Sequence, residues 1–319
     1  MPGSESTLRG RALTGPTLTA ETATHPGPQT ADVARAGASA RPRSLRIAEP
    51  IRSLARRRVL VDVLVIAALA ALMRLLFAHA EPDTDPTFAL IWGRDIIHGH
   101  LPDFAFASGP TAHPLPTVES TLVAVLGRSG AVTAILVASY ACLGAVLWGT
   151  FCLGQAMFSW PVGLLAMLLV GTNFGTVDVG LGAFLDVQFI ALLIWAAVLE
   201  LRRPCRGALV LSLLVVAGML RPEAWLLAAA YSLYAFRARR RVAVGLAVLA
   251  APLAWIVMDT IVTGHPLFAF TNAQQSSEAA ALAQSNNSGL VSFALSLLRN
   301  AMRAPVLLGG TLGFLLTWR

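Results

Sequence analysis

Residues 52–86 read RSLARRRVLVDVLVIAALAALMRLLFAHAEPDTDP, and this stretch decides how the rest of the chain is interpreted. Arginines precede the apolar run Val59–Ala80, which is long enough to cross the ~30 Å hydrocarbon core of a membrane as a helix. Because basic residues stay on the cytoplasmic side, the run should leave the cytoplasm and deliver Glu81, Asp83 and Asp85 to the outer face. The stretch therefore predicts an uncleaved membrane anchor followed by an acidic outer loop.

The composition of the whole chain agrees with a membrane protein. Of its 319 residues, 56% are hydrophobic and 13% are charged, and the mean hydropathy is +0.67, which an ordinary soluble domain does not reach. The net charge is +7, and ten Arg against four acids before residue 59 supply most of it. We therefore expect a basic tail that contacts anionic membrane lipids, and no nucleic-acid partner. The three cysteines show no spacing typical of a disulfide framework or a metal site.

Two parts of the chain differ in composition. Residues 1–57 are rich in Ala, Thr, Pro, Gly, Ser and Arg, which predicts a disordered, basic cytoplasmic tail. Residues 58–319 carry the apolar runs and are predicted to form an all-α polytopic membrane domain with about eight transmembrane helices and a large outer loop at 81–130. The predicted spans are Val59–Ala80, Ala131–Phe158, Pro161–Phe174, Val187–Leu201, Gly207–Leu220, Glu223–Phe236, Val242–Val262 and Pro305–Trp318.

Basic turns at 202–206 and 237–241 fix the sidedness of these spans, since both should be cytoplasmic. This places Gly175–Asp186, the Arg221-Pro222 turn and the polar segment Thr263–Ser288 outside. The segment Leu290–Met302 is partly amphipathic and leads into the last span.

Two helices are predicted inside the first outer loop. For the earlier one, Asp85 is a suitable N-cap, Pro86 suits the first helical position and Gly99 ends it. The later one, Leu115–Leu126, is apolar but would invert the sidedness of other spans if it crossed, so we interpret it as a juxtamembrane helix in the outer interface.

The outer acids are the first candidates for chemistry. Asp83 has no predicted capping role, which favours a functional one, whereas capping is the simpler explanation for Asp85. Asp186 stands where a loop enters a span, so it either caps that span or takes part in function. The span residues Asp62 and Arg74 are explained by snorkelling about as well as by function.

Arg221 and His113 are the other polar candidates. An outward Arg at a hairpin tip suits binding of a lipid phosphate, although Glu223 could simply pair with it. His113 and its loop neighbours His79, His98 and His100 show no ligand spacing, so ordinary polar roles are favoured over a divalent cation site.

Glycines form another pattern, Gly171-x-x-x-Gly175, which lacks a strand–turn–helix context for nucleotide binding. It predicts close helix packing instead.

Four of these local patterns together resemble the GT-C superfamily of polytopic glycosyltransferases, which includes protein O-mannosyltransferases and lipid A aminoarabinose transferases. Pro82-Asp83 before a helix ending at 98–102 resembles the family's first outer loop, and His113-Pro114 resembles its entry to the juxtamembrane helix. The stretch 185–189 is similar to the family's L-D-x-F entry to the fourth span, and 218–221 to its small–apolar–basic stretch. Thr84 stands where the family has a second acid, which leaves metal binding open.

The resemblance implies a multi-pass enzyme of a bacterial cytoplasmic membrane with its N-terminus in the cytoplasm. It would transfer a sugar, with mannose as the first candidate, from a polyprenyl-phosphate carrier to an unidentified acceptor at the outer face. Asp83 would act as base and Asp186 would orient the acceptor or assist a cation. The expected substrate-binding residues are Arg221, which would hold the carrier phosphate, together with Asp85, His113 and Glu223. No cofactor is expected beyond this lipid-linked donor, with a divalent cation as an open alternative.

Two other functions fit the same sequence: a transporter or flippase of a lipid-linked glycan, and a non-catalytic subunit of a cell-envelope glycosylation complex. Transporters place ionisable residues near mid-membrane and often contain inverted repeats. Here the acids cluster at the ends of spans and no repeat is evident, which favours the enzyme.

Overall fold

The computed structural model describes residues 44–78, 80–106, 109–204, 207–236, 241–283 and 311. These residues form eleven α-helices and contain no β-strand, which confirms the all-α prediction for this part of the chain. The chain divides into two units, residues 1–55 and 56–319. The helices are α1 (Ser44–Leu76), α2 (Thr84–Ile97), α3 (Pro114–Ala124), α4 (Gly127–Met157), α5 (Trp160–Gly171), α6 (Phe174–Leu181), α7 (Leu185–Arg202), α8 (Ala208–Gly218), α9 (Glu223–Ala235), α10 (Arg241–Thr263) and α11 (Phe268–Ala283).

Three of the described helical segments are long and apolar enough to cross a membrane: Arg57–Leu76, Gly127–Met157 and Val244–Thr263. The bent pair α5 and α6 would supply a fourth. The structure therefore indicates a multi-pass membrane protein, with fewer candidate spans in its described part than the predicted eight. Helices α8 and α9 have 11 and 13 residues, which is short for the hydrocarbon core. The predicted span Pro305–Trp318 and the predicted helix Leu290–Met302 lie outside the described residues.

The surface of α1 supports a lipid environment. Val59, Leu60, Val63 and Leu64 are each more than half exposed. A contiguous apolar surface of this kind is typical of a membrane or protein contact.

Both predicted ends of the first span differ from the structure. Helix α1 begins at Ser44, so the helix includes residues 44–57, which precede the predicted span. Ala, Leu and Arg dominate this stretch and have high helix propensities, and the span provides a formed helix for them to extend. The helix ends at Leu76 instead of Ala80. Arg74 donates to the carbonyl of Ala78, a common role for Arg at a helix C-terminus, so neither snorkelling nor catalysis is needed to explain it.

A break divides the third predicted span, Pro161–Phe174. Helix α5 ends at Gly171, and the side chain of Asn173 accepts from the backbone N–H of Thr176 and starts α6 at an angle of 61° to α5. The prediction of a loop at Gly175–Asp186 is therefore wrong for most of its length, because the Asn173 cap restarts the helix.

Close glycine packing occurs between α4 and α5, at a different pair from the one predicted. A Cβ on Gly154 would lie 2.7 Å from Cα of Gly163, so the two backbones touch at this point. Gly171 faces only a side chain of α4, and Gly175 meets nothing beyond Asn173. Between apolar helices in lipid, such close approach supplies van der Waals contact that larger residues would prevent.

The predicted polar segment Thr263–Ser288 contains α11. Its start is fixed by Asp259 of α10, a residue that is 2% exposed and whose Oδ2 accepts from the N–H of Ala269 at 2.8 Å. A buried carboxylate thus supplies the first-turn cap that the local sequence lacks.

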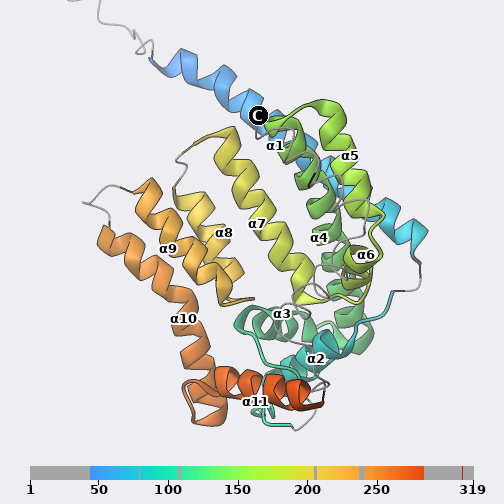
Figure 1. Ribbon diagram of the computed structural model, residues 1–319, viewed down its shortest axis with the longest axis vertical. Coiled ribbons are helices and arrows are strands. Elements are labelled where there is room, and N and C mark those ends of the chain that lie inside the picture. Colours follow the sequence, from blue (N-terminus) through green and yellow to red (C-terminus); the bar gives the residue numbers. More distant parts are fainter. Residues whose placement is uncertain are drawn as a thin grey trace, which may run out of the picture. The chain divides into compact units, whose positions relative to one another are not determined.

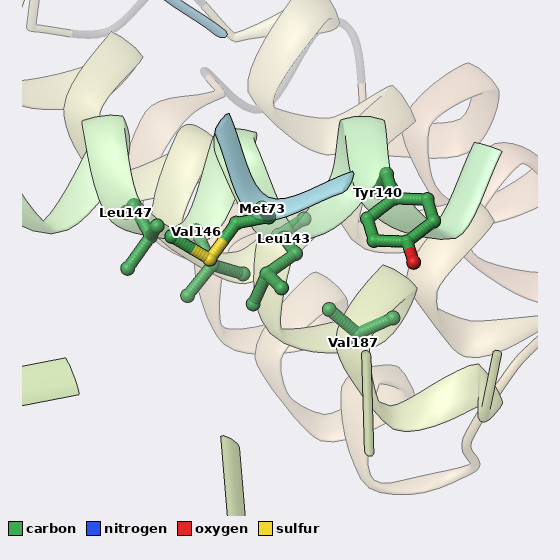
Figure 2. Close-up of a cluster of buried hydrophobic side chains, with 7 residues drawn as sticks. Met73, Tyr140, Leu143, Val146, Leu147 and Val187 are labelled. Carbon is green, nitrogen blue, oxygen red and sulfur yellow. The ribbon is translucent and has the colours of Figure 1, made fainter. Parts of the chain in front are cut away.

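Helix α4 is the centre of the packing: it contacts α3, α5, α6 and α7, and the chain continues from α7 through α8 and α9 to α10 (Figure 1). Figure 2 shows the main core cluster, in which Met73 of α1 and Val187 of α7 lie beside side chains of α4. The α4 members shown are Tyr140, Leu143, Val146 and Leu147. Tyr140 also donates to the carbonyl of Phe77, which ties the loop after α1 to α4.

Near the middle of α1, Asp62 forms a buried ion pair with Arg202 of α7. The Arg202 NH1–Oδ2 and NH2–Oδ1 distances are 2.5 and 3.0 Å, and Trp148 of α4 donates to the same carboxylate at 2.8 Å. Asp62 is 7% exposed, so the structure replaces the predicted snorkelling with an interhelical contact. The pair thereby joins the middle of α1 to the last turn of α7.

Candidate functional site

The loops that follow α1 and α6 meet beside the start of α2. The N–H of Asp83 donates to the carbonyl of Gly182 at 2.9 Å. The next residue, Ala183, has a φ of 55°, the left-handed region that non-glycine residues rarely adopt. Strained backbone of this kind tends to cluster at functional sites, and here it turns the chain from α6 into α7 directly beside the acidic loop.

The structure exchanges the predicted roles of Asp83 and Asp85. Asp83, not Asp85, is the N-cap of α2, and its side chain accepts from the N–H of Thr84. Asp85 lies in the first turn and is half-buried. The prediction of an Asp85 cap is therefore wrong by two residues, because Thr84 and Asp85 themselves adopt helical geometry. The predicted end of the helix is confirmed, since α2 stops at Ile97 and Gly99 has a φ of 79°.

Asp85 is electrostatically coupled to the other predicted site residues. Burial raises the pKa of Asp85, the charges of Asp83 and Asp186 raise it further, and the charge of Arg221 lowers it. Three acids and one cation that are far apart in the sequence thus lie within range of one another.

Arg221 and Asp186 form an ion pair through NH2 and Oδ1 in which both side chains are about one-third exposed. The guanidinium also lies 5.9 Å from the ring centre of Phe189 on α7. The alternative pairing of Arg221 with Glu223 is thus replaced by a partner from another helix, and Glu223 is exposed at the start of α9. Within the described residues, Arg221 Nε is buried and has no hydrogen-bond partner.

The turn that carries Arg221 is held by two tryptophans. The Nε1 groups of Trp225 and Trp255 both donate to the carbonyl of Gly218, at 2.9 and 3.0 Å. A Cβ on Gly218 would lie 2.7 Å from the Trp225 ring, so the close approach requires glycine here. The predicted hairpin of α8 and α9 is confirmed, with its tip fixed by these contacts.

His113 precedes α3, as predicted, and packs edge-on against Trp255 with ring centres 5.0 Å apart. Burial lowers its pKa to about 4; a hydrogen bond to the Leu220 backbone opposes this shift, while the charge of Arg221 adds to it. The imidazole is therefore neutral at pH 7. The N–H of Leu115 donates to the carbonyl of Met219, which joins the start of α3 to the turn that carries Arg221.

A pocket of about 260 Å³ lies between α2, α3, α4 and the start of α7. It contains an acid that the sequence analysis missed, Glu119 of α3, whose Oε2 accepts from Nε2 of Gln188 at 3.1 Å. Burial raises the pKa of Glu119, and the bond from Gln188 opposes that shift. An ionisable residue inside an apolar helix was the available signal. The pocket residues used below are Asp85, His113, Glu119, Ser120, Leu185 and Gln188.

Among the residues that the structure describes, no three His, Cys, Asp or Glu side chains are grouped so as to hold a metal ion. Asp186 engages Arg221 rather than a second carboxylate. His79 lies outside the described residues, while His98 contacts the carbonyl of Arg94.

Comparisons with protein-family models, with curated proteins and with solved structures find no match to this chain.

Proposed function

We propose that the protein transfers a sugar from a polyprenyl-phosphate carrier to an acceptor hydroxyl at the outer face of a bacterial cytoplasmic membrane, as members of the GT-C superfamily do. One observation carries the proposal. Asp85 lines a pocket and interacts electrostatically with Asp83, Asp186 and Arg221. A base, a cation and a cavity therefore meet at one end of a membrane domain, which is what this reaction needs.

In the proposed reaction, the acceptor oxygen attacks the anomeric carbon of the donor sugar. The bond from that carbon to the phosphate oxygen breaks, and polyprenyl phosphate leaves with the electron pair. A carboxylate removes the proton of the acceptor hydroxyl. General-base assistance of this kind contributes about 10²–10⁴ in rate.

Asp85 is a better candidate for this base than Asp83, to which the sequence analysis assigned the role. Asp83 is exposed and its side chain caps α2. Asp85 lines the pocket, and burial raises its pKa, which makes its carboxylate a stronger base. Of these two carboxylates, Asp85 is the one that a substrate in the pocket would meet.

Arg221 would balance the charge of the departing phosphate. Its Nε is an unsatisfied buried donor, which an anionic oxygen would satisfy. Asp186 would then position the guanidinium through the ion pair, rather than orient the acceptor. The charge of Glu223 acts on His113, and a neutral His113 adds no competing positive charge beside the phosphate.

The test uses purified full-length protein in proteoliposomes with labelled polyprenyl-phosphate mannose and a mixture of acceptor membranes. Asp85→Asn should lower turnover by about two decades or more. Asp83→Asn is the matched control, because Asn caps helices as well as Asp does and only the charge is lost. It should keep most of the activity.

The other outcomes separate the competing functions. If Asp83→Asn greatly lowers turnover and Asp85→Asn does not, Asp83 is the base. Movement of the labelled lipid across the bilayer without transfer would indicate a flippase. Neither movement nor transfer by the wild-type protein would contradict the proposal and leave a non-catalytic subunit.

A further inference from the structure

The pocket contains polar groups that the proposed chemistry does not use. Glu119 and Ser120 lie on α3, and Gln188 lies on α7. Asp85 would act on the acceptor hydroxyl and Arg221 on the phosphate, so neither role needs these three side chains. Their presence inside a largely apolar membrane domain therefore calls for another reason.

Two of these groups are arranged as a donor and acceptor pair. Gln188 Nε2 donates to Glu119 Oε2 at 3.1 Å, which fixes the carboxyl and the amide side by side. This bond uses one carboxyl oxygen and one amide N–H, and the second of each would offer an acceptor next to a donor to two neighbouring hydroxyl groups, each of which can donate and accept.

Ser120 supplies an observation that is independent of the contact between Glu119 and Gln188. The residue is 1% exposed, it lines the pocket, and its Oγ has no hydrogen-bond partner among the described residues. Its position is rigid, because a Cβ on Gly93 of α2 would lie 2.4 Å from the Ser120 carbonyl carbon. His113 Nδ1, which belongs to another residue at the pocket, is a second buried atom without a partner. Buried polar atoms are rarely left unsatisfied in folded proteins, so a polar ligand is expected to complete them.

The size and character of the pocket restrict that ligand. At about 260 Å³ it is below the ~300–1,000 Å³ of pockets that hold drug-sized molecules, so it suits one sugar ring rather than an oligosaccharide. The polar groups are carboxyl, amide, hydroxyl and neutral imidazole on an otherwise apolar lining, which fits the hydroxyl groups of a neutral ring.

We propose that Glu119, Gln188 and Ser120 form the subsite for the ring hydroxyls of the transferred sugar and decide which lipid-linked sugar is accepted. This inference rests on the proposed function, and it assigns substrate specificity to the contact between α3 and α7. A site that hydrogen-bonds a hydroxyl discriminates strongly against a substrate that lacks it, because the polar groups of the site are then left unpaired.

The experiment measures kcat/KM for polyprenyl-phosphate mannose and for donors that lack one ring hydroxyl each. The wild-type protein should reject at least one deoxy donor by about 10²-fold or more. In Glu119→Ala the same ratio should fall to within about threefold of unity, because the unpaired carboxyl that penalises the deoxy donor is gone. Gln188→Ala should relax discrimination at the same hydroxyl or its neighbour. Glu81→Gln, an exposed acid of the same outer loop, is the control and should leave every ratio unchanged.

A ratio between donors does not depend on how much folded enzyme is present, so a purely structural role of Glu119 would not move it. Glu119→Gln keeps the size of the side chain and gives a second measurement if the alanine variant does not fold. Transfer by the wild-type protein with unchanged ratios in the Glu119 and Gln188 variants would overturn this inference and leave the proposed function standing. No transfer of any donor by the wild-type protein would overturn both.

Discussion

The ion pair between Asp62 and Arg202 gives the sharpest prediction about stability. It joins α1 to α7, and Trp148 of α4 donates to the same carboxylate, so three helices depend on one buried group. The side chains of Arg202 and Asp62 are only 19% and 10% exposed. Replacement of Arg202 by Met keeps most of the apolar stem and removes the charge, which leaves the carboxylate buried without its counter-ion.

Removal of one partner from a buried ion pair costs about 3–5 kcal/mol. Asp62 would keep its bond from Trp148, and some water can reach it, so we expect the lower end, roughly 3 kcal/mol or two decades in the unfolding equilibrium. Asp62→Asn combined with Arg202→Met removes both charges and keeps an acceptor for Trp148. The double variant should therefore be more stable than Arg202→Met alone.

The assay is equilibrium unfolding of the purified protein in mixed micelles, followed by tryptophan fluorescence, with all four members of the mutant cycle. Arg203→Met is the control, because Arg203 is exposed and next in sequence. If Arg202→Met costs no more than Arg203→Met, the pair does not stabilise the fold. If the double variant shows no recovery, the cost comes from lost packing rather than from the stranded charge.

Two further predictions concern packing and pH. Gly163→Ala should destabilise the protein by about 1–3 kcal/mol, because the added Cβ would lie 2.6 Å from the backbone oxygen of Phe151. The control is Gly245→Ala, whose added Cβ meets nothing within 4 Å and should leave the melting temperature unchanged. His113 has a pKa of about 4 when folded and about 6.5 when unfolded, so the unfolded state binds the extra proton between these values. The free energy of unfolding should therefore fall by roughly 3 kcal/mol as the pH drops from 6.5 to 4, and His113→Gln should lack this contribution. If NMR shows that the His113 imidazole titrates near 6.5, the residue is not buried as described.

Local patterns predicted the helices of the outer loop and the hairpin well. His113-Pro114 and Gly99 mark helix ends through backbone geometry that neighbouring residues determine, and the structure has α3 and the end of α2 at these places. Local patterns failed at Asp83 and Asp85, since both residues are equally suitable caps and only the contact of Asp83 with Gly182 selects between them.

By itself, the sequence determined that this is a helical membrane protein and which charged residues lie at the ends of its helices, because hydropathy and charge act on each segment separately. Only the tertiary structure decided which charges meet. Asp186 takes Arg221 as its partner, Asp62 takes Arg202, and Glu119 accepts a hydrogen bond from Gln188. Each of these pairs joins residues far apart in the chain, and a buried charge selects its partner by the close packing of whole helices, which no local sequence pattern records.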